Sequence, residues 1–342
     1  MPPARRSTGG RPALGGMTDR AVLFLQLGGP ETLADVRGFL YRLFADPEVI
    51  RVRSGLLRRF IAASIAVTRA GTSKKMYAAI GGGSPIRRLT DEQSAGVEAI
   101  LRGRGRDVVV RTAMTCSRPL VEDVVRGLAA DGCRRFLALP LYPQYSLTTT
   151  KGALDRSREA VRRYAPGATL LEAGSFPTDP GFVGAHADLI RRELAAFPDR
   201  SPEATVVLFS AHSIPRKLVT EENDPYEREI GETVAAIVSA LGPRQRTGLA
   251  YQSKLGPVEW LGPQTIDVLG ELGRKGERQV LVVPIAFVTD HIETLYEIDQ
   301  LFARAAAEAG IAHFRRTPGL NAHPGFLEAL ASMVEAREEL WR

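Results

Sequence analysis

The chain has 342 residues, of which 44% are hydrophobic and 25% are charged, and 45 Lys and Arg against 39 Asp and Glu give it a net charge of +6. These proportions are ordinary for a soluble globular protein and argue against a disordered, collagen-like or coiled-coil chain. At about 100–200 residues per domain, the length predicts two domains. The charge excess is small and no nucleic-acid-binding motif occurs, so nucleic acid is not an expected partner.

The N-terminal segment 1–16 is basic and rich in Gly and Pro, and it lacks the apolar core of a secretory signal. We expect residues 1–18 to form a disordered basic tail. Either Met1 or Met17 fits as the start of translation.

The longest uncharged stretch, 136–150, is too short and too rich in proline to cross a bilayer, which takes about 20 apolar residues. The chain has two cysteines, Cys116 and Cys133. Two thiols provide neither a disulfide framework nor four ligands for zinc or an iron–sulfur cluster, and they indicate a reducing, cytosolic compartment.

Short apolar runs rich in Val, Leu and Phe alternate with segments of helical period along the rest of the chain. The predicted strands are 21–27, 107–114, 135–141, 168–174, 205–211, 246–252 and 279–287, with a weaker candidate at 312–320. Helical patterns between them include 33–44, 119–132 and 180–197. Near-continuous apolar strands alternating with helices predict an α/β fold with parallel sheets covered on both faces.

The two halves of the chain echo each other, because AVLFLQLGGP (21–30) can be laid over VVLFSAHSIP (206–215). Ligands of such sheets bind beyond the carboxyl ends of the strands. On this overlay Leu27 and His212 occupy matching positions that face a common cleft. Strand–loop–proline patterns are common, so both a true repeat and a coincidence stay open.

The segment VVPIAFVTDHIETLYEIDQLF (282–302) combines a buried-type strand with acidic and imidazole side chains. We expect an N-cap at 289–290 and a helix whose first turn carries His291 and Glu293. Glu293 and Glu297 are four residues apart, so they share a helix face and repel each other unless a cation or proton intervenes. Acidic residues also favour a first helical turn for dipole reasons alone.

His212 lies among small residues in FSAHSIP (209–215), directly after an apolar strand. A lone histidine at such a place is more often structural than functional. Together with the His291-x-Glu293 pair, however, its imidazole suits divalent iron, zinc or manganese.

Two further segments have both a structural and a functional interpretation. The glycine-rich IGGGSPI (80–86) lacks the dinucleotide and P-loop patterns, and it is either a plain loop between helices or a loop whose N–H groups and Ser84 receive an anion. The basic, apolar stretch 51–69 is either an ordinary amphipathic helix or a surface for an anionic membrane or an apolar, acidic ligand.

Several of these segments together resemble the ferrochelatases, enzymes that insert ferrous iron into a porphyrin in haem synthesis. The resemblance covers about residues 20 to 325 in the family's order and rests on 27–50, 80–86, 141–150, 209–215, 251–265 and 284–299. It implies a lyase with two Rossmann-like lobes, 19–165 and 166–321, and a porphyrin cleft between them. A C-terminal helix within 322–342 would return to the first lobe.

Carried over residue by residue, the resemblance implies that His212 is the cleft histidine, Glu293 the carboxylate opposite it and His291 a histidine that supports Glu293. His212 and Glu293 would also contact the metal, and Glu297 would relay protons or metal. The positions implied to line the porphyrin or to lie near its propionates are Leu27, Arg69, Tyr77, Ser84, Tyr145, Trp260 and Phe287.

The implied substrates are protoporphyrin IX and ferrous iron, with no permanently bound cofactor. No iron–sulfur cluster is expected, because no cysteine follows Cys133. The resemblance favours a cytoplasmic monomer, with a dimer and a peripheral contact at the inner face of an anionic membrane left open.

The chain departs from the family pattern at several positions. It reads Ala-Met-Thr-Cys at 113–116 where Ala-Met-Arg-Tyr is usual, and Gln26 stands where Asn is common. Leu301 falls where a third carboxylate often extends the acidic line, which shortens any relay unless Asp299 substitutes. Leu27 is commonly Tyr in coproporphyrin enzymes, which favours protoporphyrin IX.

Three alternatives to a protoporphyrin ferrochelatase stay open at this point. One is a coproporphyrin III ferrochelatase, and another is a chelatase that inserts cobalt or iron into a reduced, more acidic ring. The third is a porphyrin carrier without catalysis.

Overall fold

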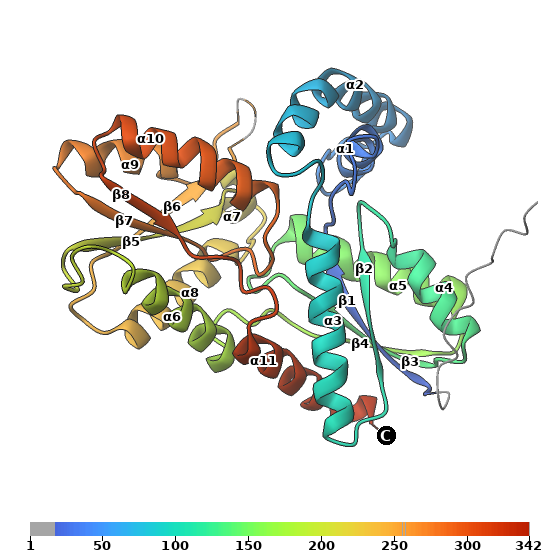
Figure 1. Ribbon diagram of the computed structural model, residues 1–342. Coiled ribbons are helices and arrows are strands. Elements are labelled where there is room, and N and C mark those ends of the chain that lie inside the picture. The colour runs from blue at the N-terminus through green and yellow to red at the C-terminus, as the bar shows by residue number, and fades with distance from the viewer. Residues whose placement is uncertain (1–17, 255, 257, 342) are drawn as a thin grey trace, which may run out of the picture.

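Two four-stranded parallel sheets lie side by side in the computed structural model, and helices cover both faces of each (Figure 1). The structure describes residues 18–254, 256 and 258–341. The predicted two-lobed α/β class is confirmed. The predicted disordered tail comprises residues 1–18, and residues 1–17 of it lie outside the described residues.

The first sheet has the strand order β2-β1-β3-β4. Its strands are β1 (Arg20–Gln26), β2 (Val109–Met114), β3 (Arg135–Pro140) and β4 (Thr169–Glu172). Helix α3 (Ile86–Gly103) covers one face, and α4 (Val121–Ala130) with α5 (Gly152–Tyr164) covers the other. Because successive strand residues point to opposite faces, β1 buries Val22 and Phe24 on one side and Leu23 on the other.

The second sheet has the order β6-β5-β7-β8. Its strands are β5 (Thr205–His212), β6 (Thr247–Gln252), β7 (Gln279–Pro284) and β8 (His313–Arg316). One face packs against α6 (Pro180–Leu194) and α8 (Tyr226–Leu241). The other face packs against α9 (Thr265–Arg274), the π-helix η2 (Glu293–Phe302) and α10 (Ala303–Glu308). Shorter helical segments are η1 (Leu147–Lys151), α7 (Arg216–Thr220) and η3 (Glu338–Leu340).

The two sheets share one topology, in which the first strand of each lobe lies between its second and third strands. Strands β1 and β5 therefore occupy equivalent positions, and the sequence echo is a true repeat of the fold. The overlay matches Phe24 with Phe209, and both side chains are fully buried. His212 ends β5, and Leu27 directly follows β1, so both lie at carboxyl ends of central strands.

The predicted boundary between the lobes needs a correction. Strand β4 pairs in parallel with β3, with Phe136 opposite Leu170, and so belongs to the first sheet. The chain therefore crosses to the second lobe after Glu172, and not between 165 and 166. The apolar run at 168–174 identifies a strand, but it does not say which sheet the strand joins.

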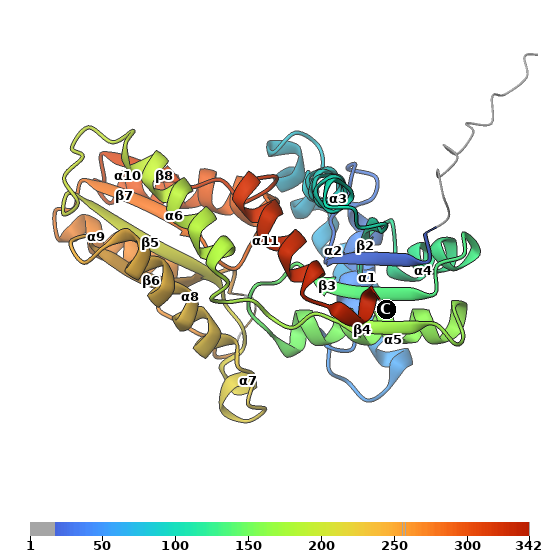
Figure 2. The same cartoon turned by 90° about the horizontal axis from the view of Figure 1, so that it is seen from below.

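Helix α11 (Pro324–Glu335) lies between the two sheets in both views (Figures 1 and 2). It contacts α3 of the first lobe and α6 of the second. Its buried residues Phe326, Leu330 and Val334 belong to one hydrophobic core that runs from Phe24 in β1 to Phe209 in β5. Beyond it, Arg20 Nε donates to the Leu340 carbonyl at 3.0 Å. The chain end thus returns to the first lobe, and the lobes share a core.

Helices α1 (Val36–Ala45) and α2 (Gly55–Ala79) form a hairpin beyond the carboxyl end of β1, which we call the lip (Figure 1). Phe39 of α1 and Ala62 of α2 pack in its small apolar core. The outer side of α2 leaves Leu56 at 80% and Phe60 at 74% exposed. The predicted amphipathic helix is thus present, and it leaves large apolar side chains uncovered.

Candidate active site

His212 is the last residue of β5, and about a third of its side chain is exposed. Its Nδ1 lies 2.5 Å from the Ser213 carbonyl oxygen. A carbonyl only accepts hydrogen bonds, so Nδ1 is the donor of this contact and the ring is held with Nε2 directed away from Ser213. Tyr226 Oη donates to the His212 carbonyl at 2.9 Å and fixes the strand end.

Glu293 begins the π-helix η2 and faces His212 across the end of the second sheet. Its Oε2 lies 3.7 Å from His212 Nε2, and a quarter of its side chain is exposed. The imidazole Nε2 and the carboxylate therefore face each other at a solvent-accessible point. Both residues come from the second lobe.

His291 lies just before the helix, where its Nδ1 is 3.0 Å from the Thr289 carbonyl oxygen. Burial lowers the pKa of His291 below its ordinary value, although the nearby Glu293 charge acts in the opposite direction. Its ring also packs edge-on against Phe287, with centroids 4.5 Å apart. His291 is thus a neutral, oriented ring beside the Glu293 carboxylate.

Glu297 lies on the same side of η2 as Glu293, as the spacing predicts. Ser253 Oγ is 3.0 Å from Glu293 Oε2 and 2.5 Å from Glu297 Oε2. Burial raises the pKa of Glu297, and the neighbouring Glu293 charge adds to the rise. The two carboxyl groups therefore form one coupled acidic pair.

The start of this helix differs from the sequence prediction. The helix has π geometry, and it begins at Glu293 instead of directly after an N-cap at 289–290. Asp290 accepts hydrogen bonds from Arg316 Nη1 and Thr294 Oγ1 at 2.8 and 2.9 Å. Arg316 holds the pKa of Asp290 below its ordinary value, even though burial acts against this. Asp290 thus ties η2 to β8.

The first lobe contributes an apolar wall to the same place. Leu27 packs in the cluster that also contains Tyr77 of α2 and Ile292, the residue before Glu293. Tyr77 is only 5% exposed. Burial raises the pKa of its hydroxyl, and the Glu293 charge raises it further. The residues that the structure brings together are His212, His291, Glu293, Glu297, Phe287, Tyr77 and Leu27.

In the described part of the chain, Trp260 and Tyr145 make their hydrogen bonds through their backbones, and these bonds do not join them to this group. Trp260 forms a bridge with Pro215, three residues after His212, and its buried Nε1 has no hydrogen-bond partner among the described residues. The Tyr145 N–H donates to Glu229 Oε2 at 2.8 Å.

The glycine-rich loop is used for packing. The Ser84 N–H donates to the Pro30 carbonyl at 2.7 Å. A Cβ on Gly83 would lie 2.0 Å from the Glu31 carbonyl oxygen, and one on Gly29 would lie 2.6 Å from Ser84 Cβ. These contacts agree with the plain-loop interpretation. Arg69 is exposed on α2, and no bond of its guanidinium is found within the described ranges.

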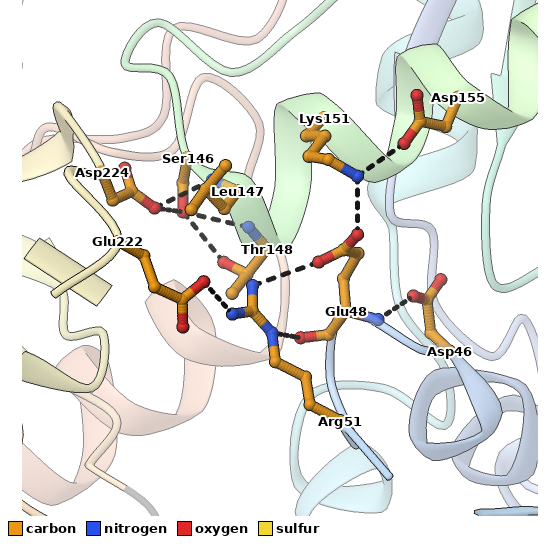
Figure 3. Close-up of polar contacts among 10 residues, drawn as sticks. All are labelled: Asp46, Glu48, Arg51, Ser146, Leu147, Thr148, Lys151, Asp155, Glu222 and Asp224. Carbon is orange, nitrogen blue, oxygen red and sulfur yellow. Dashed lines mark hydrogen bonds and ion pairs between the residues drawn. The ribbon is translucent and has the colours of Figure 1, made fainter. Parts of the chain in front are cut away.

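An ionic network joins the lobes at one end of the lip (Figure 3). Arg51 pairs with Glu48 at 3.1 Å and with Glu222 of the second lobe. At the other end of α2, Gln300 Nε2 of η2 donates to the Ala79 carbonyl at 3.3 Å. The second lobe therefore touches the lip near both ends of α2, and His212 and Glu293 lie in the lobe that makes these contacts.

The buried carboxylate of Asp224 strengthens the same junction. It accepts from Ser146 Oγ at 2.9 Å and from the Leu147 N–H at 2.8 Å (Figure 3). The segment after β3 is thus fixed to the second lobe directly before η1.

The residues that depart from the family pattern at 26, 115 and 116 form hydrogen bonds with their neighbours. Arg156 and Arg42 donate to the carbonyls of Thr115 and Cys116 at 2.8 and 2.7 Å. Burial raises the pKa of the Cys116 thiol to about 11, so it is an inert apolar side chain. Gln26 is buried, with Nε2 3.4 Å from Thr289 Oγ1.

Asp299, the residue that could have substituted for the missing third carboxylate, is bound elsewhere. Asp299 pairs with Arg316 at 2.8 Å, while Leu301 is 40% exposed. The acidic line therefore ends at Glu297. In the part of the chain that the structure describes, no three His, Cys, Asp or Glu side chains are grouped as ligands of one metal ion.

Sequence reasoning missed Ser253 and Gln252, which hold the acidic pair. The QSK triplet lies in the segment 251–265 that carries part of the resemblance. Serine and glutamine are common surface residues, so their type alone gave no sign that they contact carboxylates 40 to 45 positions away.

The family model described as Ferrochelatase matches residues 19–338. The chain belongs to the ferrochelatase family. It is 47% identical to a ferrochelatase of Synechococcus sp. (strain JA-2-3B'a(2-13)) over 93% of this chain and 92% of that protein. It is 42% identical to a ferrochelatase of Gloeobacter violaceus over 93% of this chain and 97% of that protein. The chain is therefore an enzyme of the lyase class, like the other members of this family of haem synthesis.

A solved structure of SirB from Bacillus subtilis with Fe3+ has a similar fold, with a TM-score of 0.54 and 14% identity over 93% of this chain and 95% of that chain. A second SirB structure, in complex with cobalt, gives 0.52 and 14% identity over 94% and 98% of the two chains. These likenesses confirm the two-lobed chelatase fold. Among the described residues, every helix is too short or too polar to pass through a bilayer.

Proposed function

We propose that this ferrochelatase family member inserts ferrous iron into protoporphyrin IX with release of two protons, and that His212 and Glu293 are its central catalytic residues. The observation that supports these roles is the short distance of 3.7 Å between His212 Nε2 and a Glu293 carboxylate oxygen at the end of the second sheet. The reaction needs no resident cofactor, because iron is a substrate.

The chemistry requires a base and an acidic partner. A free-base porphyrin carries two inner N–H protons, which must leave before four nitrogen atoms bind one Fe²⁺. His212 accepts one proton on Nε2 as a general base. The pair of Glu293 and Glu297 accepts the other or holds the incoming iron, which its negative charge attracts. We further propose that contacts with the apolar wall hold the ring out of plane, so that nitrogen lone pairs face these groups.

The choice of protoporphyrin rests on the apolar first-lobe wall. Leu27 packs with Tyr77 and Ile292, so the position offers no polar atom to a further propionate. An assay of the purified protein with ferrous iron and either protoporphyrin IX or coproporphyrin III tests this preference. Preferred metallation of coproporphyrin would favour that alternative, and metallation of neither ring would favour a carrier.

Substitutions test the catalytic roles. We expect His212→Ala and Glu293→Gln each to lower kcat by about 100-fold or more, the usual contribution of acid–base groups. His313→Ala is the matched control, because His313 is an exposed histidine on β8. Near-wild-type turnover in either site variant would refute the role proposed for that residue.

We also propose that the protein acts as a cytoplasmic monomer whose lip contacts the face of an anionic membrane. The outer side of α2 combines exposed Leu56, Phe60 and Val67 with Arg59, and exposed Arg53 lies just before the helix. Co-sedimentation with vesicles of neutral or anionic lipid tests the contact, and Phe60→Ser should weaken it. Binding that does not depend on anionic lipid would refute the proposal, and light scattering tests the monomer.

A further inference from the structure

Ser253 has a backbone conformation that its residue type disfavours. Within the described residues, the non-glycine residues with positive φ are Asn223, Ser253 and Asn321, at 56°, 66° and 43°. Asparagine tolerates this left-handed region through local hydrogen bonding, whereas other residues with a Cβ pay a steric cost there. Such strain persists only where the surrounding contacts determine it.

The contacts of Ser253 point to what maintains the strain. Its backbone N–H donates to Glu297 Oε1 at 3.0 Å. Its hydroxyl lies 3.0 Å from Glu293 Oε2 and 2.5 Å from Glu297 Oε2. The left-handed turn therefore aims both donors of one residue at the acidic pair. A hydroxyl has a single proton, so it links the two carboxylates as a shared donor.

Ser253 is itself fixed to the strand that ends in His212. Gln252 is 1% exposed, and its Oε1 accepts from Ser210 Oγ at 2.7 Å. Its carbonyl accepts from the Ser213 N–H at 2.8 Å. Its Nε2 lies 3.2 Å from Glu297 Oε2, so the residue before Ser253 contacts the acidic pair as well. A continuous set of hydrogen bonds therefore runs from both sides of His212 to the two carboxylates.

We infer that Ser253 is a positioning residue for iron insertion, which sets the Glu293 carboxylate in its place opposite His212. The strained backbone is then retained because it presents the N–H and the hydroxyl together. This inference rests on the proposed function of His212 and Glu293. It assigns to the segment 251–265 a role that acts through the carboxylates, not through contact with the porphyrin.

Three variants separate the hydroxyl from the backbone strain. Ser253→Gly removes the hydroxyl and relieves the positive φ, so its melting temperature should equal or exceed that of the wild type. We expect it to lower kcat by about 10- to 100-fold and to raise KM for iron, in the range usual for residues that orient metal-contacting groups. The KM for porphyrin should stay unchanged. Ser253→Thr keeps the hydroxyl and should retain turnover despite lower stability. Asn223→Gly is the control for relieving a positive φ elsewhere and should leave the kinetics unchanged.

Activity and stability should therefore move in opposite directions in the glycine and threonine variants. A merely structural role would make them move together. Wild-type kcat and iron KM in Ser253→Gly would overturn the inference, as would equal losses in the glycine and threonine variants.

A binding measurement keeps this test separate from the proposed function. Titration of the porphyrin-free protein with Co²⁺ alone should give an affinity about 10-fold or more weaker in Ser253→Gly than in wild type or Ser253→Thr. Equal Co²⁺ affinities in all three proteins would overturn the positioning role even if no porphyrin were metallated. Full turnover in His212→Ala, by contrast, would remove the proposed catalytic site whatever the Co²⁺ titration gave.

Discussion

The two lobes have the same strand order, yet they end their equivalent central strands very differently. After β1, the glycines at 28–29 pack closely on Ser117 and Ser84. At the end of β5, His212 stays partly exposed and faces Glu293. One copy of the repeat thus supplies a wall and a lip, and the other supplies the reactive groups. The comparison teaches that a duplicated sheet fixes where a site forms, while the residues after each strand decide what it does.

The largest expected effects test whether the repeated cores are one unit. Phe24→Ala and Phe209→Ala remove equivalent, fully buried rings from β1 and β5. Each should lower the free energy of unfolding by about 3–5 kcal/mol, because a buried ring is lost and a cavity remains. Since both rings lie in one continuous core, each variant should still unfold in a single transition. Two separate transitions in denaturant-induced unfolding would show independent lobes.

A smaller effect tests the close packing after β1. Gly83→Ala places a Cβ 2.0 Å from the carbonyl oxygen of Glu31. This oxygen is a backbone atom, so it cannot move aside as the end of a flexible side chain could. We expect a loss of about 1–3 kcal/mol in unfolding free energy, as is usual for overpacking. Gly127→Ala on α4 is the control, because its Cβ would meet nothing within 4 Å. A neutral Gly83→Ala would contradict the role given to this loop.

A third prediction concerns pH and the helices between the lobes. His186 on α6 is 1% exposed, and neither ring nitrogen has a hydrogen-bond partner within the described ranges. Burial, with a contribution from His323, lowers the pKa of His186 to about 3 from its ordinary 6.5.

Above pH 6.5 the ring is neutral in both the folded and the unfolded state. As the pH falls from 6.5 towards 3, only the unfolded state binds the proton, so stability is lost. At pH 5 this amounts to about 2 kcal/mol. His186→Phe should remove that share of the acid sensitivity, whereas His313→Phe at an exposed site should not. Denaturant unfolding at pH 7 and pH 5 measures this loss of unfolding free energy. An equal loss in wild type and in His186→Phe would contradict the prediction.

The smallest effect belongs to the ionic network at the end of the lip. Glu222→Gln removes one partner of Arg51, which keeps Glu48. Both side chains are partly exposed, so we expect a loss below about 1 kcal/mol that vanishes at high salt. Unfolding curves at low and high ionic strength measure it. A larger loss that persists in salt would make this contact a main link between the lobes.

Much of the fold could be predicted because the relevant signals are local. The apolar runs gave the strands, and the order of segments gave the family and, through it, His212 and Glu293. The sheet to which β4 belongs was misplaced, since partner choice depends on contacts that a single run does not encode. The π geometry of η2 was also missed, because a spacing of four brings two side chains together in an α-helix and in this helix alike. Ser253 was missed because its role comes from a left-handed turn and from distant carboxylates.

The place of α11 has a consequence for how the protein is made. The apolar face of this helix covers both lobes, and Arg20 at the start of β1 bonds the carbonyl of Leu340. During synthesis on the ribosome, the core of the first lobe therefore cannot close until nearly all of this sequence has been made. Until then, the apolar faces of α3 and α6 that receive α11 lack their cover, and uncovered apolar surface of this kind favours aggregation.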